Sequence, residues 1–112
     1  MKEYGLAYSL VNETDLSKSG ASAEDLLGVM KELVANLSGR KIILFISEVG
    51  PREVFGYFYL HPTIKSQVVA AALGGHMLNG SLGEFRIKNK SLLEVEQEIL
   101  EKLQKIRDQI VV

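Results

Sequence analysis

The sequence has no cysteine and no tryptophan, and it holds only two prolines and two histidines in 112 residues. Without cysteine, the chain cannot form a disulfide, a thiolate metal site or a cysteine nucleophile. Aspartate is scarce as well, and its three copies fall in three different predicted elements, at Asp15, Asp25 and Asp108. Two-metal hydrolysis needs several carboxylates and histidines close together. The sequence therefore predicts no metal site and no cofactor, and we expect no enzymatic activity from this chain on its own.

An excess of charge of one sign is also missing, because 13 Lys and Arg residues face 14 Asp and Glu residues, for a net charge of -1. Nucleic-acid binding would therefore have to come from a local basic patch. The longest apolar runs, "KIILFI" and "VVAAAL", are too short to span a membrane, and the first residues lack the pattern of a signal peptide. We expect a cytoplasmic protein with no membrane contact, folded as one domain over residues 1–112.

What the chain does contain is a regular switch between the periodicities of strands and helices. Strands are predicted at 4–11, 41–49, 54–60 and 83–89, and helices at 22–37, 63–73 and 91–110. Two capping boxes, Ser22 with Asp25 and Ser91 with Glu94, indicate where the first and last helices begin. The order βαββαβα predicts an α/β fold in which a mixed sheet of four to five strands is covered by three helices.

The middle helix is expected to bury Ile64, Val68, Ala71 and Ala72 against the sheet. It ends at "LGGHMLNG", residues 73–80. Glycines after a helix leave backbone N–H groups unshielded, and such concavities bind anions. His76 can donate a hydrogen bond to a phosphate oxygen. The alternative interpretation is that Gly74 caps the helix, Gly75 continues the turn and His76 lies at the surface.

A second candidate surface is basic. Arg86 and Lys88 alternate along the last predicted strand and share one of its faces, with Lys90 at its exit and Lys65 as a further candidate. The alternative interpretation is a sheet edge protected by charge.

Taken together, these segments resemble the C-terminal substrate-binding domain of the DHH phosphoesterases, the superfamily of RecJ exonuclease and the nanoRNases. The resemblance runs through "YGLAYSL", "DLSKSGASAEDLLGVMKEL", "KIILFISEV", "VFGYFYL", "IKSQVVAAALGGH" and "GEFRIKN" to the final glutamate-rich helix. It implies that Gly74, Gly75 and His76 contact the phosphate or terminal nucleotide of a substrate, with His61 and Lys65 lining the same cleft.

Two features depart from that family. Leu73 stands where the family has another glycine, and His61 stands where its hairpin delivers an arginine. Because histidine cannot reproduce the fixed, charged fork of arginine, we expect weak phosphate affinity. The catalytic Asp-His-His domain is absent from this sequence.

Three hypotheses follow from the resemblance. The chain is a non-catalytic module that holds single-stranded nucleic acid or docks on a replication or repair assembly, such as the GINS complex with which archaeal RecJ relatives associate. Alternatively, it is the substrate-binding part of a phosphodiesterase whose catalytic domain is separate or removed. In the third hypothesis it is a pure protein-interaction domain with a vestigial GGH loop.

Overall fold

The computed structural model describes residues 6–11, 23–37 and 39–110. Its elements are, in chain order, β1 (Leu6–Val11), α2 (Ala23–Asn36), β2 (Ile42–Gly50), β3 (Glu53–Leu60), α3 (Ser66–Leu73), β4 (Gly75–Met77), β5 (Leu82–Lys88) and α4 (Leu92–Ile110). The predicted fold class is confirmed: a mixed sheet packs against the helices of this part of the chain. None of these helices is long and apolar enough to cross a membrane.

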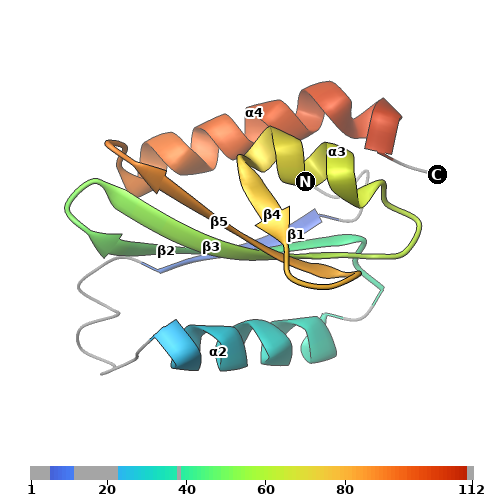
Figure 1. The fold of residues 1–112 in the computed structure, drawn as a ribbon, viewed down its shortest axis with the longest axis horizontal. Helices are drawn as coiled ribbons and strands as arrows, with labels where there is room; N and C mark the ends of the chain where they lie inside the picture. Colours follow the sequence, from blue (N-terminus) through green and yellow to red (C-terminus); the bar gives the residue numbers. More distant parts are fainter. Residues whose placement is uncertain (1–5, 12–22, 38, 111–112) are drawn as a thin grey trace.

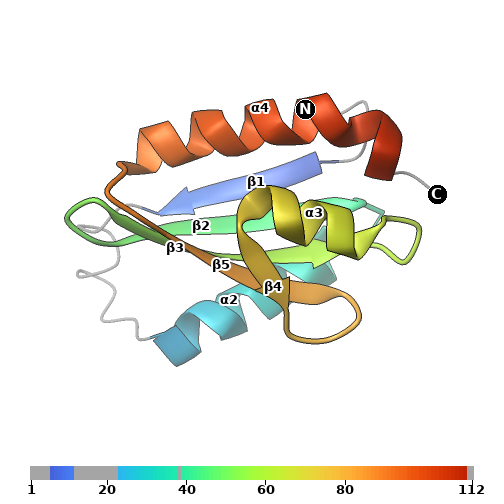
Figure 2. The ribbon, with the colours of Figure 1, turned by 45° about the horizontal axis from the view of Figure 1, so that its top comes forward.

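The five strands form one sheet in the order β1-β2-β3-β5-β4 (Figure 2). β1 and β2 are parallel and flank α2 in the chain, whereas the β2–β3, β3–β5 and β5–β4 pairs are antiparallel. α2 covers one face of the sheet, and α3 and α4 cover the other (Figure 1). β2 is buried on both faces from Ile42 to Ser47, as its unbroken apolar run predicts.

Each face of the sheet has its own hydrophobic core. The core under α3 and α4 gathers Phe58 and Phe85 from the strands with Val95, Ile99 and Leu103 from α4, all almost completely buried. The core under α2 is smaller and centres on Met30, Phe45 and Tyr57. This division fixes which side chains of β3 and β5 face α2, and three of them, Phe55, Glu84 and Arg86, contribute to the candidate site.

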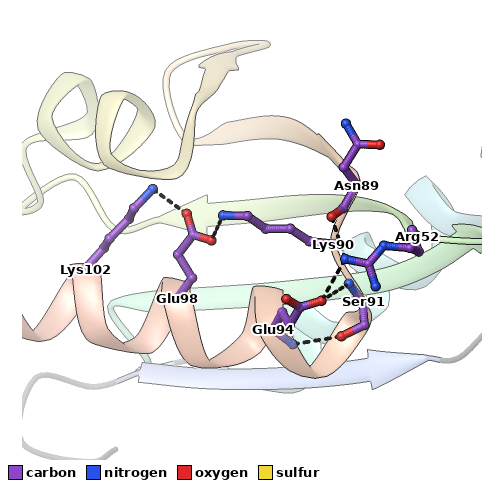
Figure 3. A network of polar contacts seen from close by, with 7 residues as sticks. All are labelled: Arg52, Asn89, Lys90, Ser91, Glu94, Glu98 and Lys102. Atoms are coloured by element: carbon purple, nitrogen blue, oxygen red, sulfur yellow. Dashed lines mark hydrogen bonds and ion pairs between the residues drawn. The ribbon is translucent and has the colours of Figure 1, made fainter.

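The predicted capping box at the start of α4 is confirmed (Figure 3). The Glu94 amide donates to Ser91 Oγ at 3.2 Å, and the Ser91 amide donates to Glu94 Oε1 at 2.9 Å. Arg52, from the turn between β2 and β3, donates to the Asn89 carbonyl at 2.7 Å and to Glu94 Oε1 at 3.2 Å. These bonds tie the β2–β3 turn to the beginning of α4. Ser22, of the other predicted capping box, lies outside the described residues.

Three predictions about α3 and the segment that follows it are wrong in whole or in part. Of the predicted buried set, Ile64 is buried and Val68 packs half-buried against the core, whereas Ala71 is exposed and Ala72 is half-buried. The buried residues of α3 are Val69, Ala70 and Leu73. The helix also begins at Ser66 rather than near Thr63. After α3 the chain does not form a loop but the short strand β4, which pairs with β5.

Candidate nucleic-acid binding site

Gly74 ends α3 in the left-handed conformation, with φ at 69°. Its amide donates to the carbonyl oxygens of Ala70 and Ala71. Glycine is the usual residue at such a helix end because a Cβ is disfavoured at positive φ. The interpretation of Gly74 as a helix cap is therefore confirmed, and its N–H group is already engaged inside the protein.

Gly75 is required for a different reason, which is close approach of two strands. It is paired with Phe85 in the β4–β5 ladder. A Cβ built on Gly75 would lie 2.2 Å from the Glu84 carbonyl oxygen and 2.9 Å from Phe85 Cβ. No side chain fits there unless β4 moves away from β5, so this glycine allows β4 to join the sheet.

His76 is the next residue of β4 and lies opposite Glu84 of β5, which in turn lies opposite Tyr57 of β3. The His76 side chain is 67% exposed, and its Nε2 atom is 3.2 Å from Glu84 Oε2. On the other side of Glu84, burial and then the negative charge of Glu84 raise the pKa of Tyr57. The imidazole thus stands at the surface, held beside a carboxylate.

Arg86, two residues further along β5, lies on the same face of the sheet as Glu84. Its guanidinium forms an ion pair with Glu53 of β3. The guanidinium carbon also lies 5.1 Å from the centre of the Phe55 ring, within the range of a cation–π contact. Arg86 is therefore held over the sheet by a carboxylate and an aromatic ring.

These groups surround one pocket of about 280 Å³ at the C-terminal end of α3. It is lined by Phe55, Gly74, Gly75, His76, Glu84, Phe85 and Arg86. The two candidate surfaces of the sequence, the GGH segment and the basic strand, thus meet at His76 and Arg86. Sequence reasoning missed Phe55 and Glu84. The alternation of β5 already placed Glu84 on the same face as Arg86.

The other candidate residues lie elsewhere. His61 follows the end of β3, where its Nδ1 atom accepts from the Thr63 amide at 3.2 Å and lies 2.9 Å from Thr63 Oγ1. Lys65 is the N-cap of α3, so the length of that helix, about 12 Å, separates it from Gly74. Lys88 pairs with Glu53 in the β3–β5 register. None of the three lines the pocket.

The basic patch is also largely neutralised. Arg86 is paired with Glu53, and Lys90 is paired with Glu98 of α4, which also binds Lys102 at 2.9 Å (Figure 3). Within the described ranges, no group of three or more His, Cys, Asp or Glu residues is arranged to hold a metal ion. The chemistry available in the pocket is thus hydrogen bonding and charge pairing by one imidazole, one guanidinium and one carboxylate.

In comparisons with known proteins, no family model matches this chain, and no curated protein matches it either.

Proposed function

We propose that this chain is a non-catalytic, RecJ-like binding module that holds single-stranded nucleic acid, and that a phosphate group of the strand occupies the pocket at the end of α3. One observation carries the proposal: His76 of the GGH segment and Arg86 of the basic strand line the same pocket. An imidazole and a guanidinium on adjacent strands can both donate to one phosphate.

The guanidinium and the imidazole each already have a carboxylate partner, so a phosphate would bind by exchange. The Arg86–Glu53 and His76–Glu84 pairs are solvent-accessible, with side chains of Arg86 and His76 that are 53% and 67% exposed. Exposed ion pairs contribute little, between zero and about 1 kcal/mol, because water and salt screen them. A bidentate arginine–phosphate contact is stronger than such a pair. Exchange is therefore feasible, and the affinity should be modest.

The test is a fluorescence-anisotropy titration with internally labelled single-stranded oligonucleotides. Arg86→Gln and His76→Ala should each weaken binding, and Arg86→Gln should also reduce the slope of log K against log salt, by about 0.7 for the phosphate that it no longer neutralises. Lys88→Gln is the matched control, because it removes the same charge two residues along the same strand, outside the pocket. Its effect should be clearly smaller.

Glu84→Gln provides the opposite perturbation. It removes the carboxylate beside His76 while keeping the size of the side chain. If a phosphate competes with Glu84, this variant should bind more tightly than the parent. Equal losses in Arg86→Gln and Lys88→Gln would instead assign binding to the strand face as a whole. If the parent binds no single strand, the proposal is wrong, and the hypotheses of a separate catalytic domain or a protein-docking role gain support.

A further inference from the structure

A second pocket lies on the face of the sheet that α2 covers, the face that also carries Glu84 and Arg86. It is located between α2 and the turn that joins β4 to β5. Its volume is about 210 Å³. It is lined by Lys31 and Val34 of α2, Tyr59 of β3, Leu82 of β5, and Asn79 and Ser81 of the turn. None of these residues is part of the first pocket.

Tyr59 is the aromatic group of this second pocket. It is the last of three aromatic residues that face α2 from alternate positions of β3, after Phe55 and Tyr57. Phe55 and Tyr57 are 9% and 6% exposed and belong to the core, whereas Tyr59 is only half-buried and lines the pocket. Of these three rings, Tyr59 is therefore the one placed to stack against a planar ligand.

The polar groups around Tyr59 suit the rest of a nucleotide. Lys31 is exposed and has no ion-pair partner within the described part of the chain. The Asn79 side chain is fixed because its Oδ1 atom accepts from the amides of Ser81 at 2.9 Å and Leu82 at 2.8 Å. This arrangement leaves the side-chain NH2 group of Asn79 as a hydrogen-bond donor. The pocket thus offers an aromatic ring, an apolar floor, one cation and one amide.

The positions of the two pockets relate them to one strand of nucleic acid. Arg86 lines the first pocket and Leu82 lines the second, and they are four residues apart on β5. At about 3.3 Å per residue, they are separated by about 13 Å along the sheet. A ligand that occupies both pockets must therefore extend along β5, as consecutive nucleotides of a single strand can.

We propose that this second pocket is a nucleobase subsite, in which a base stacks on Tyr59 and the adjoining phosphate pairs with Lys31, while a phosphate further along the strand occupies the His76–Arg86 pocket. The proposal rests on the proposed function and adds to it a second contact point and a path for the nucleic acid along β5. Stacking on an aromatic side chain tolerates any base, because every base has a π-face. The subsite should therefore show little sequence preference.

The test compares Tyr59→Leu, Tyr59→Phe and Lys31→Gln with the parent, using thymidine 5′-monophosphate and 5′-phosphorylated oligothymidylates of increasing length. Tyr59→Leu should weaken binding of the oligonucleotides by about thirtyfold, the middle of the range for removal of one stacked base. Tyr59→Phe keeps the ring and should bind like the parent. Binding of the monophosphate should weaken less than that of the oligonucleotides, because the first pocket can still take its phosphate.

Lys31→Gln should lower the salt slope for oligonucleotides by about 0.7, the share of one phosphate neutralised on a single strand. Lys105→Gln is its control, since Lys105 lies on α4, on the other face of the sheet. Circular dichroism checks that each variant is folded, and Lys31 is an exposed helix residue whose replacement leaves both cores intact.

The outcomes separate this proposal from the one on which it rests. If the parent binds and both Tyr59→Leu and Lys31→Gln bind equally well, the second subsite is wrong and the first pocket stands. If Tyr59→Phe loses as much affinity as Tyr59→Leu, the hydroxyl group rather than the ring makes the contact, and stacking is refuted. If the parent binds neither monophosphate nor oligonucleotide, both proposals fail.

Discussion

Replacing Gly75 with alanine tests whether the GGH segment is built as described. The added methyl group would lie 2.2 Å from the Glu84 carbonyl oxygen and 2.9 Å from Phe85 Cβ. The first of these neighbours is backbone, so it cannot turn aside as a flexible side chain can. β4 must therefore shift away from β5, and the pairing of Gly75, His76 and Met77 with β5 weakens.

The cost should resemble that of other overpacking substitutions, about 1–3 kcal/mol. β4 has three residues and lies at the edge of the sheet, so it can separate without unfolding the two cores. We therefore expect a decrease of about 2 kcal/mol in the free energy of unfolding. With a urea dependence of about 2 kcal/mol per molar, the midpoint of denaturation should fall by about 1 M. Urea titration followed by circular dichroism measures this shift.

Gly74→Ala is the matched comparison, because nothing lies within 4 Å of a Cβ at that position. Its cost should come only from holding alanine at a φ of 69°, about 1 kcal/mol. Gly74→Asn should cost less, since asparagine tolerates this conformation better. If Gly75→Ala is as stable as the parent, a Cβ fits between the strands, and the described β4–β5 contact and the pocket built on it are both wrong.

Three further predictions concern α4 and its neighbours. Ser91→Ala removes the N-cap hydroxyl and should cost about 1 kcal/mol, or about 4 °C in the midpoint of thermal unfolding; an unchanged midpoint would contradict the capping role. Hydrogen bonds from Lys90 and Lys102 lower the pKa of Glu98 below its ordinary value of 4.5. The ionised Glu98 therefore stabilises the fold fully above pH 4.5, and this stabilisation is lost as the pH falls through the lowered pKa. Glu98→Gln should therefore make the free energy of unfolding less dependent on pH below 4.5. An unchanged pH dependence in this variant would refute the role of Glu98. The hydrogen bond from Tyr8 to Glu96 raises the pKa of Tyr8 above 10.0. The protonated Tyr8 therefore stabilises the fold below pH 10.0, and this stabilisation is lost as the pH rises through the raised pKa. Tyr8→Phe should not show this loss of stability at alkaline pH.

The parts of the fold that sequence reasoning predicted are those set by local or strongly periodic signals. The capping box of Ser91 and Glu94 acts within one helical turn, so its spacing alone identifies the start of α4. The observed charge pairs Glu98–Lys102 and Glu101–Lys105 depend on the same short-range geometry, because residues four apart are neighbours on a helix. The unbroken apolar run of β2 predicted burial on both faces, because no polar position marks a solvent side.

The buried face of α3 could not be predicted in this way. Its sequence, SQVVAAAL, is apolar almost all round, so periodicity does not choose between faces. The choice is made by packing, and Val69, Ala70 and Leu73 join the core that α4 covers. β4 escaped prediction for a related reason. Three residues are too few for an alternating pattern, and they form a strand only because β5, later in the chain, lies beside them.

The candidate pocket depends on the same non-local register. The alternation of β5 places Glu84 and Arg86 on one face, and this much is readable from the sequence. That Glu84 lies against His76, and that Phe55 lies under Arg86, depends on β5 being inserted between β3 and β4. Because strand order is a property of the whole sheet, no local sequence motif predicts it.

The two glycines of the GGH segment show why such a motif does not by itself indicate a binding loop. Gly74 is explained by the left-handed conformation at the end of a helix, and Gly75 by the close approach of two strands. Each glycine therefore has a structural explanation that needs no ligand. Because its N–H group is engaged at the helix end, Gly74 leaves no free amide for an anion. The phosphate binding that we propose therefore depends on the side chains that this backbone positions, above all on His76 at the edge of the sheet beside Arg86. Ligand affinity should follow substitutions at those two side chains, while the glycines should affect affinity only as far as they affect the fold.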